Sequence, residues 1–139
     1  MGLEARNVKK MPPEEIRENL AYYYCTEQYW RTIPLKGAPV MTDGVKAMAE
    51  MCEAFWLVDA IVSWQTEDKV RNAPFQVWIL CINDDYSARL VCEDGNHNVI
   101  CSQDIAQTDF PLKEGITVYV DLTMIENALT KVLLLPSEY

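Results

Sequence analysis

Residues 55–64 read Phe55-Trp56-Leu57-Val58-Asp59-Ala60-Ile61-Val62-Ser63-Trp64, a largely apolar run that contains a single carboxylate. Such a run is typical of a helix at the centre of a hydrophobic core. Thr42-Asp43-Gly44 has the composition of an N-terminal cap, so we expect one helix over residues 43–66. Asp59 follows Cys52 of the apolar stripe by seven residues, close to two helical turns. The pattern therefore predicts that Asp59 faces the core.

The predicted burial of Asp59 makes it the first candidate for a functional residue, because a buried carboxylate costs free energy unless a partner satisfies it. One interpretation is a polar anchor that accepts hydrogen bonds from a tyrosine, a tryptophan or loop amides. The other is a catalytic base whose pKa is raised by burial. A second acid would come from a short polar stretch that contains Glu27, Asp43, Asp109 or Glu138. We retain Asp59, Asp109 and Glu138 as the catalytic candidates.

On either side of this helix the pattern predicts a second helix and several strands. Pro12-Pro13-Glu14-Glu15 indicates the start of a first helix that runs to about Cys25. Residues 26–41 are mostly loop, with a short extended piece at 29–33. After residue 69 the periodicity becomes strand-like. The expected strands cover residues 75–82, 86–93, 98–102, 116–122 and, as a short fifth strand, 132–135, while 124–129 is compatible with a helical turn.

Two helices followed by strands predict an α+β fold, with the N-terminal helices packed on one face of a four- or five-stranded antiparallel sheet. Residues 11–139 form a single domain in this prediction, and residues 1–10 form a flexible tail. If the first hairpin closes at Asp84-Asp85, residue 77 pairs with 92 and residue 79 with 90. The face toward the helices then carries Val77, Ile79, Cys81, Leu90, Cys92, Val99 and Cys101.

The charge balance narrows the class of partner. The 139 residues include 21 acidic and 12 basic side chains, which gives a formal net charge of −9. Such a surface repels phosphate backbones, so it argues against direct nucleic-acid binding. It suits either a plain solvated surface that keeps the protein soluble or contact with a host protein that has a basic surface. No apolar run approaches the roughly 20 residues of a membrane helix, and the N-terminus lacks the hydrophobic segment of a signal peptide. We expect a cytoplasmic protein without membrane contact.

The five cysteines, at positions 25, 52, 81, 92 and 101, form no C-x-x-C pair, and we expect free thiols in a reducing compartment. Cys81, Cys92 and Cys101 share the predicted sheet face, and the only histidine, His97, lies in a turn between the last two. Structural zinc sites normally pair their ligands at short spacings, which this set lacks. Core packing of the thiols and a solvated His97 are the better interpretation, and we expect no metal or other cofactor.

Several polar stretches follow one another in a specific order: Thr26-Glu27, Thr42-Asp43-Gly44-Val45, Trp56-Leu57-Val58-Asp59-Ala60-Ile61 with Gln65, Thr108-Asp109-Phe110-Pro111, and the terminal Leu135-Pro136-Ser137-Glu138-Tyr139. This order resembles an uncharacterised bacterial family, known only as a domain of unknown function. The resemblance runs from about Leu20 to Tyr139. It implies a small single-domain protein of a kind found on plasmids, in phages and in cyanobacteria. The chain departs from the family pattern at Val40-Met41, where an aromatic is usual, and in the extra polar stretch 123–130.

Three functional hypotheses are compatible with these observations. The preferred one is a non-enzymatic interaction protein of a phage or plasmid, which inhibits a host defence nuclease (anti-CRISPR or anti-restriction type) by occupying its nucleic-acid groove. The second is a small hydrolase-like enzyme that uses Asp59 with Asp109 or Glu138. The third is a homodimer whose interface contains exposed Trp30, Trp64 and Trp78. The expected binding residues are Trp56, Asp59, Gln65, Thr108, Asp109, Phe110, Glu138 and Tyr139. Thr108-Asp109-Phe110-Pro111 can form a hydroxyl-carboxylate turn with Phe110 tucked inward.

Overall fold

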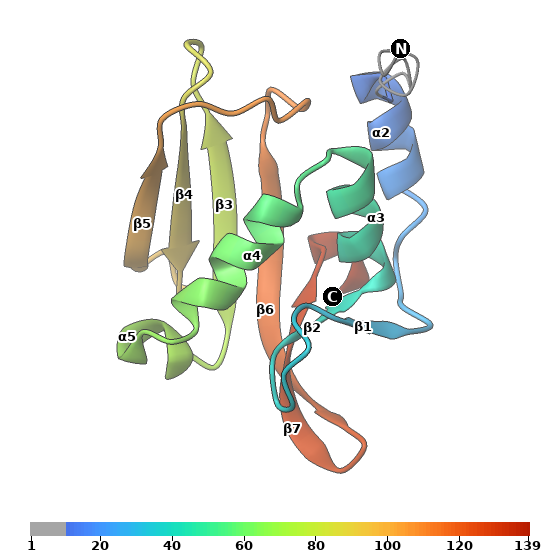
Figure 1. The fold of residues 1–139 in the computed structure, drawn as a ribbon, viewed down its shortest axis with the longest axis vertical. Helices are drawn as coiled ribbons and strands as arrows, with labels where there is room; N and C mark the ends of the chain where they lie inside the picture. The colour runs from blue at the N-terminus through green and yellow to red at the C-terminus, as the bar shows by residue number, and fades with distance from the viewer. Residues whose placement is uncertain (1–10) are drawn as a thin grey trace, which may run out of the picture.

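The computed structural model describes residues 11–139, and the predicted tail at residues 1–10 lies outside the described residues. Helices and one twisted seven-stranded sheet make up the described chain (Figure 1). The helices are α2 (Pro13–Leu20), α3 (Asp43–Met51), α4 (Phe55–Trp64), α5 (Asp68–Arg71) and the short 3-10 helix η1 (Pro136–Glu138). The strands are β1 (Tyr29–Arg31), β2 (Val40–Thr42), β3 (Gln76–Ile82), β4 (Ala88–Glu93), β5 (Val99–Ile105), β6 (Ile116–Ile125) and β7 (Ala128–Leu134). The α+β class is confirmed.

The sheet has the strand order β1-β2-β7-β6-β3-β4-β5, which differs from the predicted four or five antiparallel strands. Six strand pairs join the seven strands, and five of them are antiparallel; the exception is β2, which runs parallel to β7 through Val40↔Val132 and Met41↔Leu133. The extended piece expected at 29–33 is β1, whereas β2 comes from a stretch predicted as loop. A three-residue strand shows too little alternation to be recognised in sequence.

The helix expected over residues 43–66 is in fact two helices, because the chain turns at Glu53. Glu53 has a left-handed backbone with φ 52°. The amide of Ala54 donates to the carbonyl of Ala49 at 2.8 Å, and that of Glu53 to Glu50 at 3.3 Å. A left-handed residue followed by this long-range bond ends a helix in the manner of a Schellman motif. The chain therefore leaves α3 and restarts as α4 in a new direction (Figure 1).

The first helix begins as predicted and ends earlier. Pro13 occupies the first turn together with Glu14 and Glu15, and Ile16 is fully buried against the core. The helix stops at Leu20 and not near Cys25. A turn follows, closed by hydrogen bonds from the amides of Tyr22 and Tyr23 to the carbonyls of Asn19 and Leu20, and Tyr24 beyond it is 73% exposed.

The β3–β4 hairpin is shifted by one residue from the predicted register. Tyr86 adopts a left-handed conformation, φ 66°, so that the loop holds three residues and Trp78 pairs with Cys92. A shift of one residue exchanges the two faces of a strand. Trp78 and Leu80 therefore face the helices. The prediction that Val77, Ile79 and Cys81 lie on this face is wrong. Leu90, Cys92 and Cys101 are buried as expected, and Val99 is exposed.

Residues 124–129 form the end of a β-hairpin and not a helical turn. Glu126 and Asn127 both have positive φ, 49° and 66°, as a two-residue type I′ turn requires. The predicted short strand at 132–135 is the last part of the longer β7. The β6–β7 ribbon extends past the other strands at one end of the molecule (Figure 1).

The core lies between the sheet and the helices that cover one of its faces. Val45, Met48, Leu57 and Ile61 supply the helical side. From the sheet, Trp78 is buried to 1% exposed, which excludes it from the interface of exposed tryptophans proposed for a homodimer. Within residues 11–139, no helix combines the length and the apolar character needed to cross a membrane.

Candidate functional site

Asp59 is exposed to solvent, so the prediction that its carboxylate is buried is wrong. The reason is the break at Glu53. Because the helix restarts at Phe55, α4 turns Leu57 and Ile61 toward the core and leaves Phe55 and Asp59, four residues apart, on the outer side. Both interpretations of Asp59, as a buried anchor and as a desolvated base, required a buried carboxylate and therefore fail. Its contribution to binding stays a prediction.

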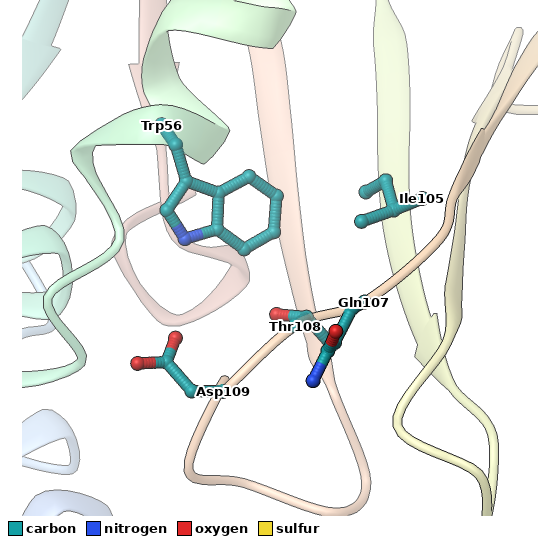
Figure 2. Close-up of a pocket in the computed structure, with 5 residues that line it drawn as sticks. All are labelled: Trp56, Ile105, Gln107, Thr108 and Asp109. Atoms are coloured by element: carbon teal, nitrogen blue, oxygen red, sulfur yellow. The ribbon is translucent and has the colours of Figure 1, made fainter.

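A hollow between the first turn of α4 and the connection from β5 to β6 contains several of the predicted site residues. It has a volume of about 550 Å³ and is lined by Trp56, Ile105, Gln107, Thr108 and Asp109. Figure 2 shows the Trp56 indole pointing toward Thr108 and Asp109, with Ile105 on the far side. We call this hollow the Trp56 groove.

The loop that forms one wall of the groove is held by one hydrogen bond to the β3–β4 loop and by one within the loop itself. The amide of Thr108 donates to the carbonyl of Tyr86 at 2.7 Å. The hydroxyl of Thr108 accepts a hydrogen bond from the amide of Phe110 at 3.1 Å, which is the hydroxyl-based turn expected for this stretch. The Phe110 ring points inward and is 7% exposed. Phe110 therefore anchors the loop, while Thr108 and Asp109 remain at the groove.

The chemical character of the Trp56 groove suits contact with another protein. Trp56 and Ile105 provide apolar surface, and Gln107, Thr108 and Asp109 provide an amide, a hydroxyl and a carboxylate. Next to Trp56 on α4, the Phe55 ring is 43% exposed. Half-buried tryptophans beside polar groups are frequent anchors of protein interfaces. An open groove of this kind accepts a side chain or an extended segment.

Glu138 lies elsewhere, at the start of α3. Its carboxylate accepts hydrogen bonds from the Thr42 hydroxyl at 2.6 Å, from the Gly44 amide at 3.0 Å and from the Leu135 amide at 2.9 Å. A side chain on Gly44 would place its Cβ 2.6 Å from the Glu138 carboxyl carbon, so any larger residue there would displace the Glu138 carboxylate. A carboxylate in this position is favoured by the helix dipole. Glu138 thus fastens the C-terminal segment to α3.

Asp43, on the same turn, holds the loop that precedes β1. Its two oxygens accept the indole N–H of Trp30 at 2.8 Å and the amide of Glu27 at 2.9 Å, while its own amide donates to the Thr26 hydroxyl at 2.9 Å. The Trp30 indole, and next the Glu27 amide, lower the pKa of the Asp43 carboxyl by donating to its charged form. The stretches at 26–27, 42–44 and 135–139 therefore meet in one structural cluster.

Gln65 lies in a third region, in the interior of the molecule. It is 8% exposed and exchanges two hydrogen bonds with the fully buried Gln76, at 2.8 and 2.9 Å. The indole of Trp78 and the ammonium of Lys131 also donate to this pair, each at 2.8 Å. Burial, and next the charge of Arg71, lower the pKa of Lys131. These bonds join the end of α4 to the sheet.

Tyr139 lies against two other aromatic rings. Its ring centroid is 5.3 Å from that of Phe75 and 5.6 Å from that of Tyr119, and Phe75 and Tyr119 are 5.1 Å apart. The side chain is nevertheless 72% exposed. Edge-to-face contacts of this kind stabilise the C-terminus by about 0.5–1.5 kcal/mol per ring pair.

The cysteines do not gather as predicted, because Cys81 is exposed on the opposite face from Cys92 and Cys101. Burial raises the pKa of the thiols of Cys92 and Cys101, and it raises the pKa of Cys52 to about 12. The His97 side chain is 92% exposed, as expected for its turn. Across residues 11–139 there is no cluster of three or more histidine, cysteine, aspartate or glutamate side chains that could hold a metal ion.

The predicted site residues are therefore distributed over separate places. The Trp56 groove brings together Trp56, Thr108 and Asp109, whereas Glu138, Gln65 and Tyr139 take part in internal contacts. The sequence reasoning missed Ile105 and Gln107 because it ended the strand at 102. The alternation of Cys101, Gln103 and Ile105 on one face was the signal that could have extended it.

The comparisons with known proteins give a family and no activity. The chain belongs to the family of unknown function DUF6876, whose match covers residues 14–139. No curated protein and no solved structure matches the chain.

Proposed function

We propose that this DUF6876 member is a non-enzymatic, cytoplasmic interaction protein that uses the Trp56 groove to engage a basic segment of a partner protein. The observation that carries the proposal is the groove itself, an aromatic and aliphatic floor with the Asp109 carboxylate in its wall. It occurs on a chain with a net charge of −9. Apolar contact supplies affinity and the acidic surface attracts and orients a basic partner.

A nuclease of a host defence system is the partner class that best fits this chemistry. Its nucleic-acid groove is basic and open, so an acidic protein can occupy it in place of the phosphate backbone. The resemblance to proteins of phages and plasmids supports this choice, because a mobile element benefits from such inhibition. The inhibitor would need no catalytic group of its own.

The arrangement of carboxylates favours this proposal over a hydrolase. A pair of acids that shares a reaction must reach one substrate position within hydrogen-bond distance. Asp109 lies in the Trp56 groove, and the Glu138 carboxylate is bound at the start of α3 by Thr42 and Gly44. Asp59, the proposed base, is exposed on α4, away from both of these carboxylates in the sequence and outside the Trp56 groove lining.

The experiment is a cleavage-protection assay with a panel of purified restriction endonucleases and RNA-guided nucleases. The full chain, added in increasing molar ratio, is expected to block cleavage by at least one of them. Because charge contributes to the contact, inhibition should weaken by roughly tenfold or more when the salt concentration rises from about 50 to about 200 mM. Cleavage that continues unchanged for every nuclease, at any protein ratio, would contradict the proposal.

Two aromatic substitutions separate the groove from the general surface. Trp56→Ala removes the floor of the groove and should abolish or strongly weaken inhibition. Tyr24→Ala is the matched control, because Tyr24 is an aromatic residue outside the groove with 73% of its side chain exposed. Equal activity of both variants would assign inhibition to another surface. Circular dichroism of each variant checks that the fold is intact.

A further inference from the structure

A second hollow lies beside the N-terminal half of α3, away from the Trp56 groove. It has a volume of about 330 Å³, and the residues that matter in its lining are Tyr23, Glu27, Trp30, Asp43, Lys46 and Glu50. Two aromatic residues, three acidic residues and one lysine thus line the same hollow. We call this hollow the Trp30 cage.

Lys46 already occupies the cage as a cation. Its Nζ lies 4.5 Å from the centre of the Trp30 ring, within the range of a cation–π interaction. The same Nζ is 2.9 Å from Glu50 Oε2, one turn further along α3. The Glu50 side chain is 54% exposed. The ring face of Trp30 is therefore a surface that accepts an ammonium group in this fold.

The Trp30 ring is held in place for this contact. Its indole N–H donates to Asp43 Oδ1 at 2.8 Å, and the Trp30 backbone in β1 pairs with Met41 of β2. Asp43 Oδ2 accepts the amide of Glu27 at 2.9 Å, so the ring and the loop at Glu27 share one anchor. A ring that is fixed beforehand loses little entropy when a ligand stacks on it.

Three carboxylates and one ammonium line the cage, so its lining carries a net negative charge that attracts a cation. We propose that the Trp30 cage binds the cationic side chain of a basic peptide, preferably an arginine, which takes the place of the Lys46 ammonium on the Trp30 face. The site does not depend on the Trp56 groove and stands whether or not that groove binds a nuclease.

Arginine fits the cage better than lysine for two reasons. Its planar guanidinium stacks on an indole and is more weakly hydrated than an ammonium. Its several N–H donors can bind the Glu50 carboxylate, which already lies 2.9 Å from the ammonium on this ring, while the plane stays on the ring. The Lys46 side chain is only partly buried, 29% exposed, and is free to move toward solvent when displaced.

The test uses a labelled peptide of alternating arginine and serine, with the citrulline version as a neutral probe. Fluorescence anisotropy gives the dissociation constant, and the indole N–H resonance of Trp30, identified by its loss in Trp30→Phe, reports the site. The proposal expects this resonance to shift with the arginine peptide and not with the citrulline peptide.

Lys46→Met removes the internal competitor and is expected to tighten arginine-peptide binding by about three- to tenfold. Lys69→Met is the matched control, because it changes the net charge equally and lies on α5, on the other side of the molecule from α3 (Figure 1). Lys69→Met should change the dissociation constant of the arginine peptide by less than about twofold, because a distant charge is screened by salt.

Three results would overturn the proposal. The first is an equal gain in arginine-peptide affinity for Lys46→Met and Lys69→Met, which would indicate general electrostatic attraction. The second is peptide binding that leaves the Trp30 indole resonance in place. The third is absence of binding to both the wild-type chain and Lys46→Met.

Discussion

Glu138 and Asp59 are two carboxylates with opposite environments. Glu138 accepts three hydrogen bonds, from Thr42, Gly44 and Leu135, whereas Asp59 is exposed on the outer side of α4. Removing a charged acceptor leaves its donors unsatisfied, which is costly when they are partly buried. The function of each residue follows from these partners and not from the residue type.

The first prediction compares these two residues directly. Glu138→Ala should lower the free energy of unfolding by about 2–3 kcal/mol, because three donors lose a charged acceptor. Asp59→Ala should change it by less than about 0.5 kcal/mol, as for an exposed residue. Urea unfolding followed by circular dichroism measures both. A large loss for Asp59→Ala would show that this carboxylate is anchored after all.

The second prediction concerns acid pH and Asp43. The pKa of its carboxyl is lowered from its ordinary value of 3.8, chiefly by the Trp30 indole and then by the Glu27 amide. A carboxyl with a lowered pKa in the folded state stabilises the fold above its unfolded pKa, and this contribution is lost as the pH falls through the folded value. The stability difference between wild type and Asp43→Asn should therefore be largest near neutral pH and shrink below about pH 4. Urea midpoints from neutral pH downward test this, and a constant difference would contradict it.

At the scale of elements, left-handed residues set the geometry of the helices and hairpins. Glu53 separates α3 from α4, Tyr86 fixes the β3–β4 register, and Glu126-Asn127 closes the β6–β7 hairpin. None of them is glycine, and a non-glycine residue in this region costs free energy that the surrounding contacts must offset. These three turns decide which face of each element meets the core.

The third prediction uses the β6–β7 turn. Asn127→Gly should raise the free energy of unfolding by about 0.5–1 kcal/mol, because glycine adopts φ 66° without steric cost and the type I′ turn favours it at this position. Asn96→Gly is the control, since Asn96 lies in the β4–β5 turn but is not among the residues with positive φ. That change should be neutral or destabilising. Equal stabilisation by both would contradict the turn assignment.

The same turns explain how much of the fold could be predicted. The α+β class, the start of the first helix and the cores of β3, β4 and β6 follow from periodicity, which depends on side chains alone. The break at Glu53 and the three-residue loop at Tyr86 could not be predicted, because a left-handed glutamate or tyrosine is rare and has no sequence signal. The strand pair of β2 and β7 depends on a contact across the whole chain.

Only the part of the candidate site that depends on local structure could be predicted from the sequence. The Thr108-Asp109 turn and the inward Phe110 follow from local hydrogen-bonding chemistry and are confirmed. The buried Asp59 was an inference from an uninterrupted helix, and one left-handed residue reversed it. That Glu138 meets Thr42 and Gly44 is a tertiary contact that local patterns cannot show.

For the molecule as a whole, one layer of helices and one sheet leave the acidic charge on the surface. The net charge of −9 repels a second copy of the chain, and the buried Trp78 removes one of the three tryptophans of the dimer interface considered from sequence. Both features argue against a homodimer built on these tryptophans.

The fourth prediction is that the protein stays monomeric. Multi-angle light scattering at several concentrations in moderate salt should give a molar mass of 16.0 kDa throughout. A mass that doubles with concentration would show self-association and would count against the proposed mode of action.

The most direct test of the Trp56 groove is hydrogen exchange measured by mass spectrometry on the chain alone and in complex with a nuclease that it inhibits. Backbone amides in residues 55–64 and 105–110 are expected to exchange more slowly in the complex, because the partner covers α4 and the neighbouring loop. Protection confined to β3, β4 and β5, with those two segments unchanged, would contradict the assignment of this surface.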